Sequence, residues 1–536
     1  MMHRTLLIGL DGMCFTILNP LIEEGVMPFL GQCMKTGIHG ELISTPCPVT
    51  PPAWTTIMTG RNPGNHGIFD FITVDPRYTD KIVFRLTNAR DILCETIWSI
   101  AGRQGRVAGS LNFPQMFLST PFNGYMIPGF VTSRHLKTST QPREFWERIK
   151  NLPDVNIKDI SWDLNEGRKA IGGGLQEEDY KEWIDYLIRK EKGWYAIAIE
   201  LIEKTPCDLV AVVFEGTDRL LHQVWRLLDP AFMPKNLTSW EKDTREHCLD
   251  YFRQLDSMVC ELVESAGEDT RIFMVSDHGL GPTTEIFYSN MWLEKHGYLY
   301  WKDGVQSDKK GLLSAHNMRE HFDSIDWNRT VAYTRTTSAN GIYIRVAKEP
   351  GQPGIPPEKY ASLRSELIES LLSYKDPRTN TPVVTKIMTR EEAFPGIAME
   401  EAPDLTLTLR DNGFVSILKA DDLVKPRPKV GGTHSPIGIF IAGGKNIRKA
   451  SALPPQTISD VAPTLLYSMG LPVPEDFEGK VITESFDPGF LKDNPVRIGD
   501  ATIPPADVFR KDTSDTLKDS DEKQILQRLK DLGYFG

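Results

Sequence analysis

The sequence predicts an α/β fold in which a mostly parallel central sheet carries helices on both faces. Three apolar runs, at residues 5–10, 208–214 and 271–276, are typical of buried strands. Amphipathic stretches of helical period lie between strands, and this alternation indicates parallel strands joined by crossover helices. With 536 residues, of which 40% are hydrophobic and 25% charged, the chain can bury a large core without needing disulfides or structural metals for stability.

Secondary structure is expected in a definite order. A Gly-Val-Met-Pro sequence at 25–28 breaks the first helical stretch, and Gly470 ends the last helix of the core. Further strands are expected at 38–43, 107–111 and 437–442, and helices at 16–36, 53–59, 89–104, 143–151, 178–204, 240–266, 459–470 and 520–532, with another after Thr217.

The regular alternation stops between residues 284 and 430. Proline, glycine and charged residues are frequent there, and the strands look short. We interpret this segment as an inserted cap that selects the substrate. The core then comprises 1–283 and 431–488, and 489–536 is a charged C-terminal tail. The cap aromatics are expected mainly to form its own core, and they are Tyr288, Trp292, Tyr298, Tyr300, Trp301, Tyr333 and Tyr343.

Composition excludes several classes of protein. The net charge of −11 leaves no basic excess for binding a nucleic-acid polymer. The seven cysteines are dispersed and form no CxxC pair, so neither a disulfide framework nor a thiolate zinc site is expected. No apolar run reaches the length of a membrane span, and the N-terminal run is too short for a signal peptide. A cytoplasmic protein is the default expectation.

Polar residues that bind metals follow several of the expected strands. Asp11 ends the first strand, where open α/β sheets bind ligands. Asp218 and His222 are four residues apart, so on a helix they share one face. Asp277 and His278 follow the strand at 271–276. Each of these has a structural alternative, such as an Asp-Gly turn or a surface pair.

Two further stretches complete the set. His434 lies in Gly431-Gly432-Thr433-His434, where two glycines allow the backbone to approach a site closely. Thr50 carries a hydroxyl group and has prolines on both sides, and residues 53–59 after it have a spacing compatible with a helix. Neither stretch is specific by itself.

The order of these motifs resembles the type I phosphodiesterase/nucleotide pyrophosphatase family of the alkaline phosphatase superfamily. The similarity covers residue 5 to about 83, 205–285 and 430–482, and it includes the segment from Thr56 to Ile68 that follows the nucleophile. It implies an alkaline-phosphatase-like core with two divalent metal ions. Zn²⁺ suits the ligands, with Mn²⁺ or Fe²⁺ as alternatives. One ion would be held by Asp218, His222 and His434, and the other by Asp11, Asp277, His278 and the Thr50 oxygen.

The resemblance also implies the reaction. Thr50 would be the nucleophile of a hydrolase that cleaves a small phosphodiester or pyrophosphate substrate through a phospho-Thr50 intermediate. The chain departs from the nucleotide pyrophosphatases at Ala53, near which they have an Asn that donates to the phosphoryl group. A backbone N–H at the helix start is one replacement donor. Asn112, expected just past the strand at 107–111, is our hypothesis for another. Arg219 is expected to form a surface salt bridge.

Other functions remain open at this stage. A phosphomonoesterase or a phosphonate hydrolase of the same superfamily would share the metal ligands and differ in the pocket. A sulfatase needs Cys or Ser before its proline and an Arg further on, and the stretch from Thr50 to Trp54 has neither. A non-catalytic binding protein on this scaffold is a third class. His66 is expected to support its turn and not to bind metal.

Overall fold

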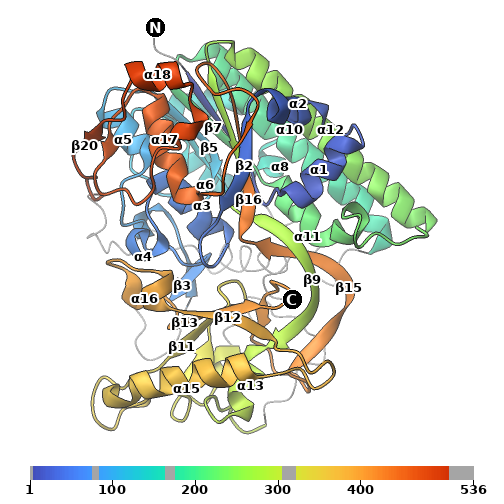
Figure 1. The fold of residues 1–536 in the computed structure, drawn as a ribbon, viewed down its shortest axis with the longest axis vertical. Helices are drawn as coiled ribbons and strands as arrows, with labels where there is room; N and C mark the ends of the chain where they lie inside the picture. The colour runs from blue at the N-terminus through green and yellow to red at the C-terminus, as the bar shows by residue number, and fades with distance from the viewer. Residues whose placement is uncertain (1–3, 75–83, 163–175, 305–320, 506–536) are drawn as a thin grey trace.

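The computed structural model describes residues 4–74, 84–162, 176–304 and 321–505. These residues form an α/β core and a smaller β-rich cap, which lies below the core in Figure 1. In the described part of the chain, no helix combines the length and the apolarity that crossing a bilayer requires. The predicted helix at 520–532 lies outside the described residues.

The core is built on a mixed sheet of nine strands. β1 pairs in parallel with β7 and with β8, whereas β16 runs antiparallel to both of its neighbours because the chain enters it from the cap. The predicted α/β class is confirmed. In spatial order the strands are β17 (Ser451–Ala452), β2 (Ile38–Ile43), β16 (Ile437–Gly444), β8 (Arg271–Val275), β1 (Thr5–Leu10), β7 (Leu209–Phe214), β5 (Ala108–Phe113) and β6 (Gly124–Pro128), with β18 (Gln456–Thr457) also on β2.

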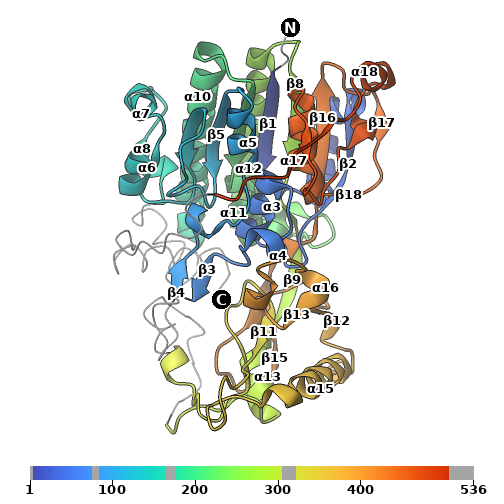
Figure 2. The same cartoon turned by 90° about the vertical axis from the view of Figure 1, so that its left-hand side faces the viewer.

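Helices cover both faces of the sheet (Figure 2). Side chains of β1 alternate between the two layers: Leu6 and Ile8 pack in one hydrophobic cluster, and Leu7 packs in the other. One layer contains α1 (Phe15–Glu23), α2 (Pro28–Thr36), α10 (Tyr180–Lys204), α11 (Gly216–Leu228) and α12 (Ser239–Ala266), and the other contains α3 (Thr50–Thr59), α5 (Ile97–Arg103) and α17 (Val461–Ser468).

A long antiparallel ribbon connects the core to the cap. It consists of β9 (Gly279–Tyr288) and β15 (Val424–Ser435), and both curved strands are visible in Figure 1. The chain therefore leaves the core at Gly279 and re-enters it through Ser435. The cap adds β10 (Ala332–Thr334), β11 (Gly341–Ile344), β12 (Val384–Thr389), β13 (Leu405–Leu409), β14 (Val415–Ser416), α13 (Ser289–Lys295), α15 (Tyr360–Ser373) and α16 (Arg390–Ala393).

Most aromatic residues of the cap belong to one hydrophobic cluster, which is formed mainly by the cap and also includes core residues such as Phe71 and Trp162. Trp292, Tyr298, Trp301 and Tyr333 are buried in this cluster, and Tyr288 and Tyr343 pack against it. Tyr300 lies outside the cluster, and the Arg329 guanidinium covers its ring at 3.9 Å. The expectation that the aromatics mainly build the cap is confirmed for six of the seven.

The remaining α-helices and strands that the structure describes are short. They are α4 (Pro63–His66), β3 (Ile72–Val74), β4 (Phe84–Leu86), α6 (Ser133–Ser139), α7 (Arg143–Ile149), α8 (Ile157–Ile160), α18 (Pro488–Asp493), β19 (Val473–Pro474) and β20 (Ile498–Gly499). β20 pairs with β19, so the first part of the predicted tail packs against the core.

Two predicted helices differ from the structure. The helix expected at 89–104 is a single 3-10 turn at Ala89–Asp91 followed by α5, because Asn88 caps the turn and Thr96 caps a new helix. The helix expected from residue 53 already begins at Thr50, since Pro51 and Pro52 fit the first turn, where no N–H is needed.

Candidate two-metal site

The predicted ligands meet at the carboxyl edge of the three central parallel strands. Asp11 follows β1 directly, Asp277 and His278 follow β8, and α11 begins just after β7. Because β8, β1 and β7 are parallel neighbours, the residues that follow them lie together at one edge of the sheet. All six ligand side chains are at least 92% buried.

Asp218, His222 and His434 form the first group. The Nε2 atoms of His222 and His434 lie 3.3 and 3.4 Å from Asp218 Oδ1, and 3.1 Å from each other. Ligands 2.0–2.1 Å from a shared tetrahedral ion are separated by about 3.3 Å. The three atoms are therefore spaced as ligands of one ion. The i,i+4 spacing on α11 aligns the first two, and β15 brings the third.

Asp11, Asp277 and His278 form the second group. His278 Nε2 lies 3.4 Å from Asp277 Oδ2 and 3.6 Å from Asp11 Oδ1. The turn after Asp11 needs Gly12, whose φ is 69° and whose backbone N–H donates to Asp277 Oδ1 over 3.4 Å. A Cβ at this position would lie 2.4 Å from Leu280. The Asp-Gly turn is therefore present, and it is compatible with the predicted ligand role of Asp11.

Backbone carbonyls orient all three imidazoles. The Nδ1 atoms of His222, His278 and His434 lie 2.9, 3.0 and 2.6 Å from the carbonyl oxygens of Gly432, Gly279 and Pro48. A carbonyl only accepts, so each Nδ1 carries the hydrogen and each Nε2 presents a lone pair to its group. The rings of His278 and His434 also stack with centroids 3.8 Å apart, which links the two groups.

The electrostatics of the site favour cations. Burial raises the pKa of Asp11 and of Asp277 well above the usual range, and the neighbouring carboxylates add to the effect. Burial also acts to raise the pKa of Asp218, but His222 and His434 outweigh it and lower that pKa. Among the described residues, Asp11 Oδ1, Asp218 Oδ1 and Asp277 Oδ2 accept no hydrogen bond. Three buried carboxylates with such atoms, beside convergent imidazole nitrogens, fit two divalent cations.

Thr50 is the first residue of α3 and lies at the second group. Its Oγ1 is 3.2 Å from His278 Nε2, and the side chain is 2% exposed. Pro51 and Pro52 have no N–H, and the N–H of Ala53 donates to Val49 O at 3.0 Å. Of the predicted backbone donors at the helix start, residues 51 to 53 therefore offer none to a substrate.

Asn112 does not lie where the sequence placed it. It is inside β5, not beyond its end, in the left-handed conformation with φ 62°, where the register between β5 and β6 slips. Its Nδ2 donates to Val213 O over 2.8 Å. Among the residues that the structure describes, no hydrogen bond joins it to Thr50 or to a ligand. Its role as a substrate donor stays a prediction.

Arg219 was wrongly expected at the surface. Its side chain is 9% exposed, its Nη2 lies 3.2 Å from Glu215 Oε1, and its guanidinium covers the Trp162 ring at 5.5 Å. Glu215 also pairs with Lys190, which is 1% exposed. The predicted salt bridge is present, but it is buried beside the turn that carries Asp218.

His66 supports its turn as predicted. Its Nδ1 accepts the N–H of Ile68 at 3.1 Å, so its Nε2–H donates to Thr56 Oγ1 at 3.0 Å. The ring is fully buried, and burial lowers its pKa to about 3. It belongs to neither ligand group.

Two site residues were missed from the sequence. Trp54 Nε1 donates to Asp11 Oδ2 over 3.2 Å. Its position four residues after Thr50, on the same helix face, was the available signal. Phe414 of the cap places its ring edge-on to His434 with centroids 5.2 Å apart. No local pattern marks that contact, because residue 414 is distant in sequence from every ligand except His434.

The sheet, with two Asp/His groups beside a threonine at a helix start, defines an enzyme fold of the alkaline phosphatase superfamily. The chain belongs to the type I phosphodiesterase/nucleotide pyrophosphatase family, whose model matches residues 5–436. It is thus a hydrolase of the phosphodiesterase/pyrophosphatase type. A comparison with curated proteins gives no match.

Several solved structures are similar to this chain. Murine ectonucleotide pyrophosphatase/phosphodiesterase 5 is 14% identical with a TM-score of 0.50, over 92% of this chain and 99% of that chain. Its inactive form in complex with AMP is 15% identical (TM-score 0.49; 88% and 95% covered). Phosphonoacetate hydrolase from Sinorhizobium meliloti 1021, in complex with phosphonoformate, is also 15% identical (TM-score 0.47; 87% and 95% covered).

Proposed function

We propose that the protein is a two-metal hydrolase that cleaves a phosphodiester or pyrophosphate bond of a small substrate through a phospho-Thr50 intermediate. The observation that carries the proposal is the Thr50 hydroxyl, 3.2 Å from His278 Nε2 at the start of α3. Both ligand groups support it. A cytoplasmic location stays a prediction.

The residues of the chain divide the work. Asp218, His222 and His434 would hold one divalent cation, and Asp11, Asp277 and His278 the other, with Zn²⁺ the best match to mixed carboxylate and imidazole ligands. When bound, the cations supply Lewis-acid charge beside the reacting phosphorus.

Thr50 would act as the nucleophile. Its Oγ1 bonds to phosphorus as the bond from phosphorus to the leaving oxygen breaks, and water then cleaves the Thr50–phosphorus bond. Two prolines and a fully buried Trp54 hold Thr50 in place, which matters because positioning supplies much of the rate enhancement in phosphoryl transfer.

A phosphomonoesterase or phosphonate hydrolase is the second candidate, and Ala53 favours keeping it. The side chain at 53 is fully buried and apolar, so it offers no donor to a phosphoryl oxygen. The segment around Thr50 therefore supports the type of reaction better than it supports a nucleotide as the substrate.

A panel of chromogenic substrates tests the proposal. A phosphodiester, a phosphomonoester, a nucleotide 5′-ester, a phosphonate ester and a sulfate ester are compared with Zn²⁺, with Mn²⁺ and with EDTA. We expect metal-dependent turnover that is fastest with the diester or the nucleotide ester. Faster sulfate-ester turnover, or turnover unaffected by EDTA, would contradict the proposal.

Thr50→Ala tests the nucleophile. We expect turnover to fall by about 10⁴-fold or more, while the bound metal stays nearly unchanged, because losing the nucleophile removes the covalent route. Thr59→Ala removes another buried hydroxyl of α3, and it is the matched control, since within the described part of the chain the Thr59 hydroxyl bonds to Thr55 O and to the N–H of Arg61. Equal losses in the two variants would show a general effect of damage to α3. A sulfatase, by contrast, would reveal itself in the substrate panel.

A further inference from the structure

The loop of the cap that follows β13 reaches the metal-binding edge of the core. It contains Asp411 and Phe414 and leads into β14. Asn340 fixes it from the cap side, since its Nδ2 donates to Gly413 O over 3.0 Å and its Oδ1 accepts the N–H of Val415 at 2.9 Å. The loop is therefore a defined part of the cap.

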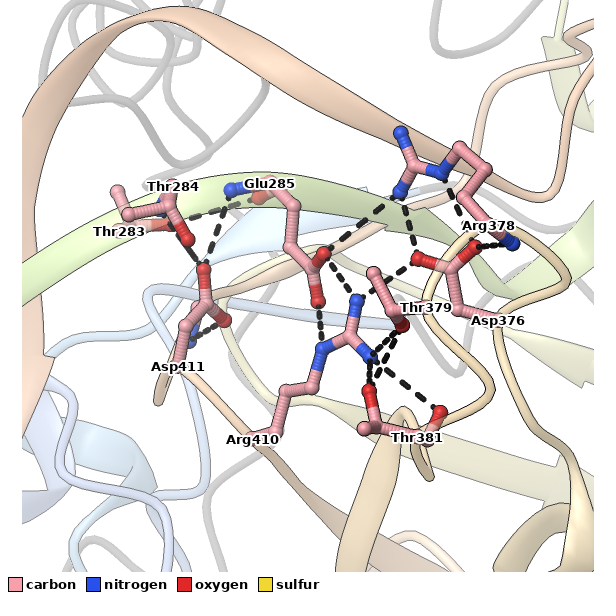
Figure 3. Close-up of polar contacts among 10 residues, drawn as sticks. Thr283, Thr284, Glu285, Asp376, Arg378, Thr379, Thr381, Arg410 and Asp411 are labelled. Carbon is pink, nitrogen blue, oxygen red and sulfur yellow. Dashed lines mark hydrogen bonds and ion pairs between the residues drawn. The ribbon is translucent and has the colours of Figure 1, made fainter.

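Asp411 binds the ribbon where its pairing is irregular. Pro426 lies opposite Glu285 and Gly431 opposite Thr283, so four residues of β15 face a single residue of β9. At this slip Asp411 Oδ2 accepts three hydrogen bonds, from Thr283 Oγ1 (3.1 Å), Thr284 N (2.9 Å) and Glu285 N (3.2 Å), as Figure 3 shows. The carboxylate thus attaches the loop to β9.

The same carboxylate shapes the loop. Asp411 Oδ1 accepts the N–H of Gly413 at 2.9 Å, which turns the chain immediately before Phe414. The Phe414 ring is 6% exposed and stands edge-on to the imidazole of His434. Asp411 therefore determines where the Phe414 ring lies.

His434 depends on its surroundings for its orientation. It is held at Nδ1 by Pro48 O and on one face by the His278 ring, and its Nε2 faces Asp218 and His222. The edge contact with Phe414 adds a cap residue to the surroundings of this ring. Partners behind a metal ligand fix its rotation and so set the affinity of the site.

We propose that Asp411 and Phe414 position His434, so that docking of the cap loop on the β9/β15 ribbon sets the metal affinity of the Asp218–His222–His434 group. They are positioning residues, because the contact through which they act on the metal group is that of the Phe414 ring with His434. The inference rests on the proposed two-metal function and adds to it a dependence of one site on the cap.

The test uses three single variants of the full chain. Asp411→Asn keeps the shape but replaces one oxygen by a donor, so one set of accepted hydrogen bonds is lost. Phe414→Leu removes the ring, and Phe414→Tyr retains it. Asp404→Asn is the matched control. Asp404 also accepts a cap backbone N–H, from Ile344 at 2.6 Å, together with the Tyr360 hydroxyl, and among the described residues it forms no hydrogen bond with the ribbon.

Zn²⁺ affinity is measured by competition with a chelator, and Co²⁺ substitution gives an absorption spectrum that reports ligand geometry. For Asp411→Asn and Phe414→Leu we expect the affinity for one of the two bound Zn²⁺ ions to fall by about 10- to 100-fold, and the Co²⁺ spectrum to change. Phe414→Tyr restores both properties, and Asp404→Asn keeps both.

The outcomes separate this inference from the function on which it rests. Two tight equivalents in the wild type together with unchanged affinity and spectrum in Asp411→Asn and Phe414→Leu would overturn the inference alone. Equal weakening in Asp404→Asn would also overturn it, because cap stability would then be the cause. A wild type that binds no metal would overturn the two-metal assignment, and the inference with it.

Discussion

His66 gives the fold a sensitivity to acid that can be measured. Its ring is fully buried, and its Nδ1 must stay unprotonated to accept the N–H of Ile68. Burial lowers the pKa to about 3 in the folded protein, against about 6.5 in the unfolded chain. Between these values the unfolded state binds more protons. The stability is therefore complete above about pH 6.5 and is lost as the pH falls toward 3.

The size of the loss follows from the two pKa values. Each pKa unit corresponds to about 1.4 kcal/mol, so the full effect is about 5 kcal/mol, and about 2 kcal/mol of it is lost by pH 5. His66→Gln removes the titration, and its amide can still accept and donate. The same substitution at the partly exposed His247 controls for the loss of a histidine.

Urea unfolding of the core, followed by tryptophan fluorescence in the presence of a chelator, measures the effect at pH 7.5, 6.0 and 5.0. Wild type and the His247→Gln control should lose about 2 kcal/mol more than His66→Gln between pH 7.5 and 5.0. An equal loss of unfolding free energy in all three proteins would refute the reasoning, because the loss would then come from other titrating groups that the three proteins share.

Three further substitutions have expected outcomes. Gly9→Ala would place a Cβ 2.4 Å from the Trp54 ring, so thermal denaturation should show a loss of about 1–3 kcal/mol, and an unchanged midpoint contradicts this. Asn112→Ala should lower kcat if Asn112 donates to substrate, and Asn112→Gly, which suits the positive φ, separates that effect from backbone strain; an unchanged kcat excludes the role. Arg219→Met should lower the free energy of unfolding in urea by about 1.5–3 kcal/mol, because Glu215 loses a charged donor. A free energy of unfolding equal to that of the wild type would contradict this.

Five of the six candidate ligands could be predicted from the sequence because each follows a strand or shares a helix face, whereas His434 lies within β15. Asp11 and Asp277 directly follow buried apolar runs, and the edge at which parallel strands end is common to all of them. The i,i+4 spacing of Asp218 and His222 needs only helical geometry. These signals are local, and the resemblance to a known family added the grouping of the six ligands.

The signals that failed depend on distant parts of the chain. Arg219 looks like a surface residue on its own helix, but α10 brings Lys190 to the same carboxylate and buries the pair. Asn112 lies within β5 because a slip in the register lengthens the strand, which periodicity cannot show. The contact of Phe414 with His434 arises only when the cap folds onto the ribbon.

The ribbon has a practical consequence for engineering. His434 lies opposite Leu280, so the two ends of the inserted segment are neighbours at the core. A chain that leaves and returns at adjacent points can be exchanged as a cassette, much as loops are grafted between antibodies. Exchanging caps between relatives would test the prediction that the cap selects the substrate. If Phe414 positions His434 as proposed, each graft would have to bring an aromatic side chain that reaches this imidazole.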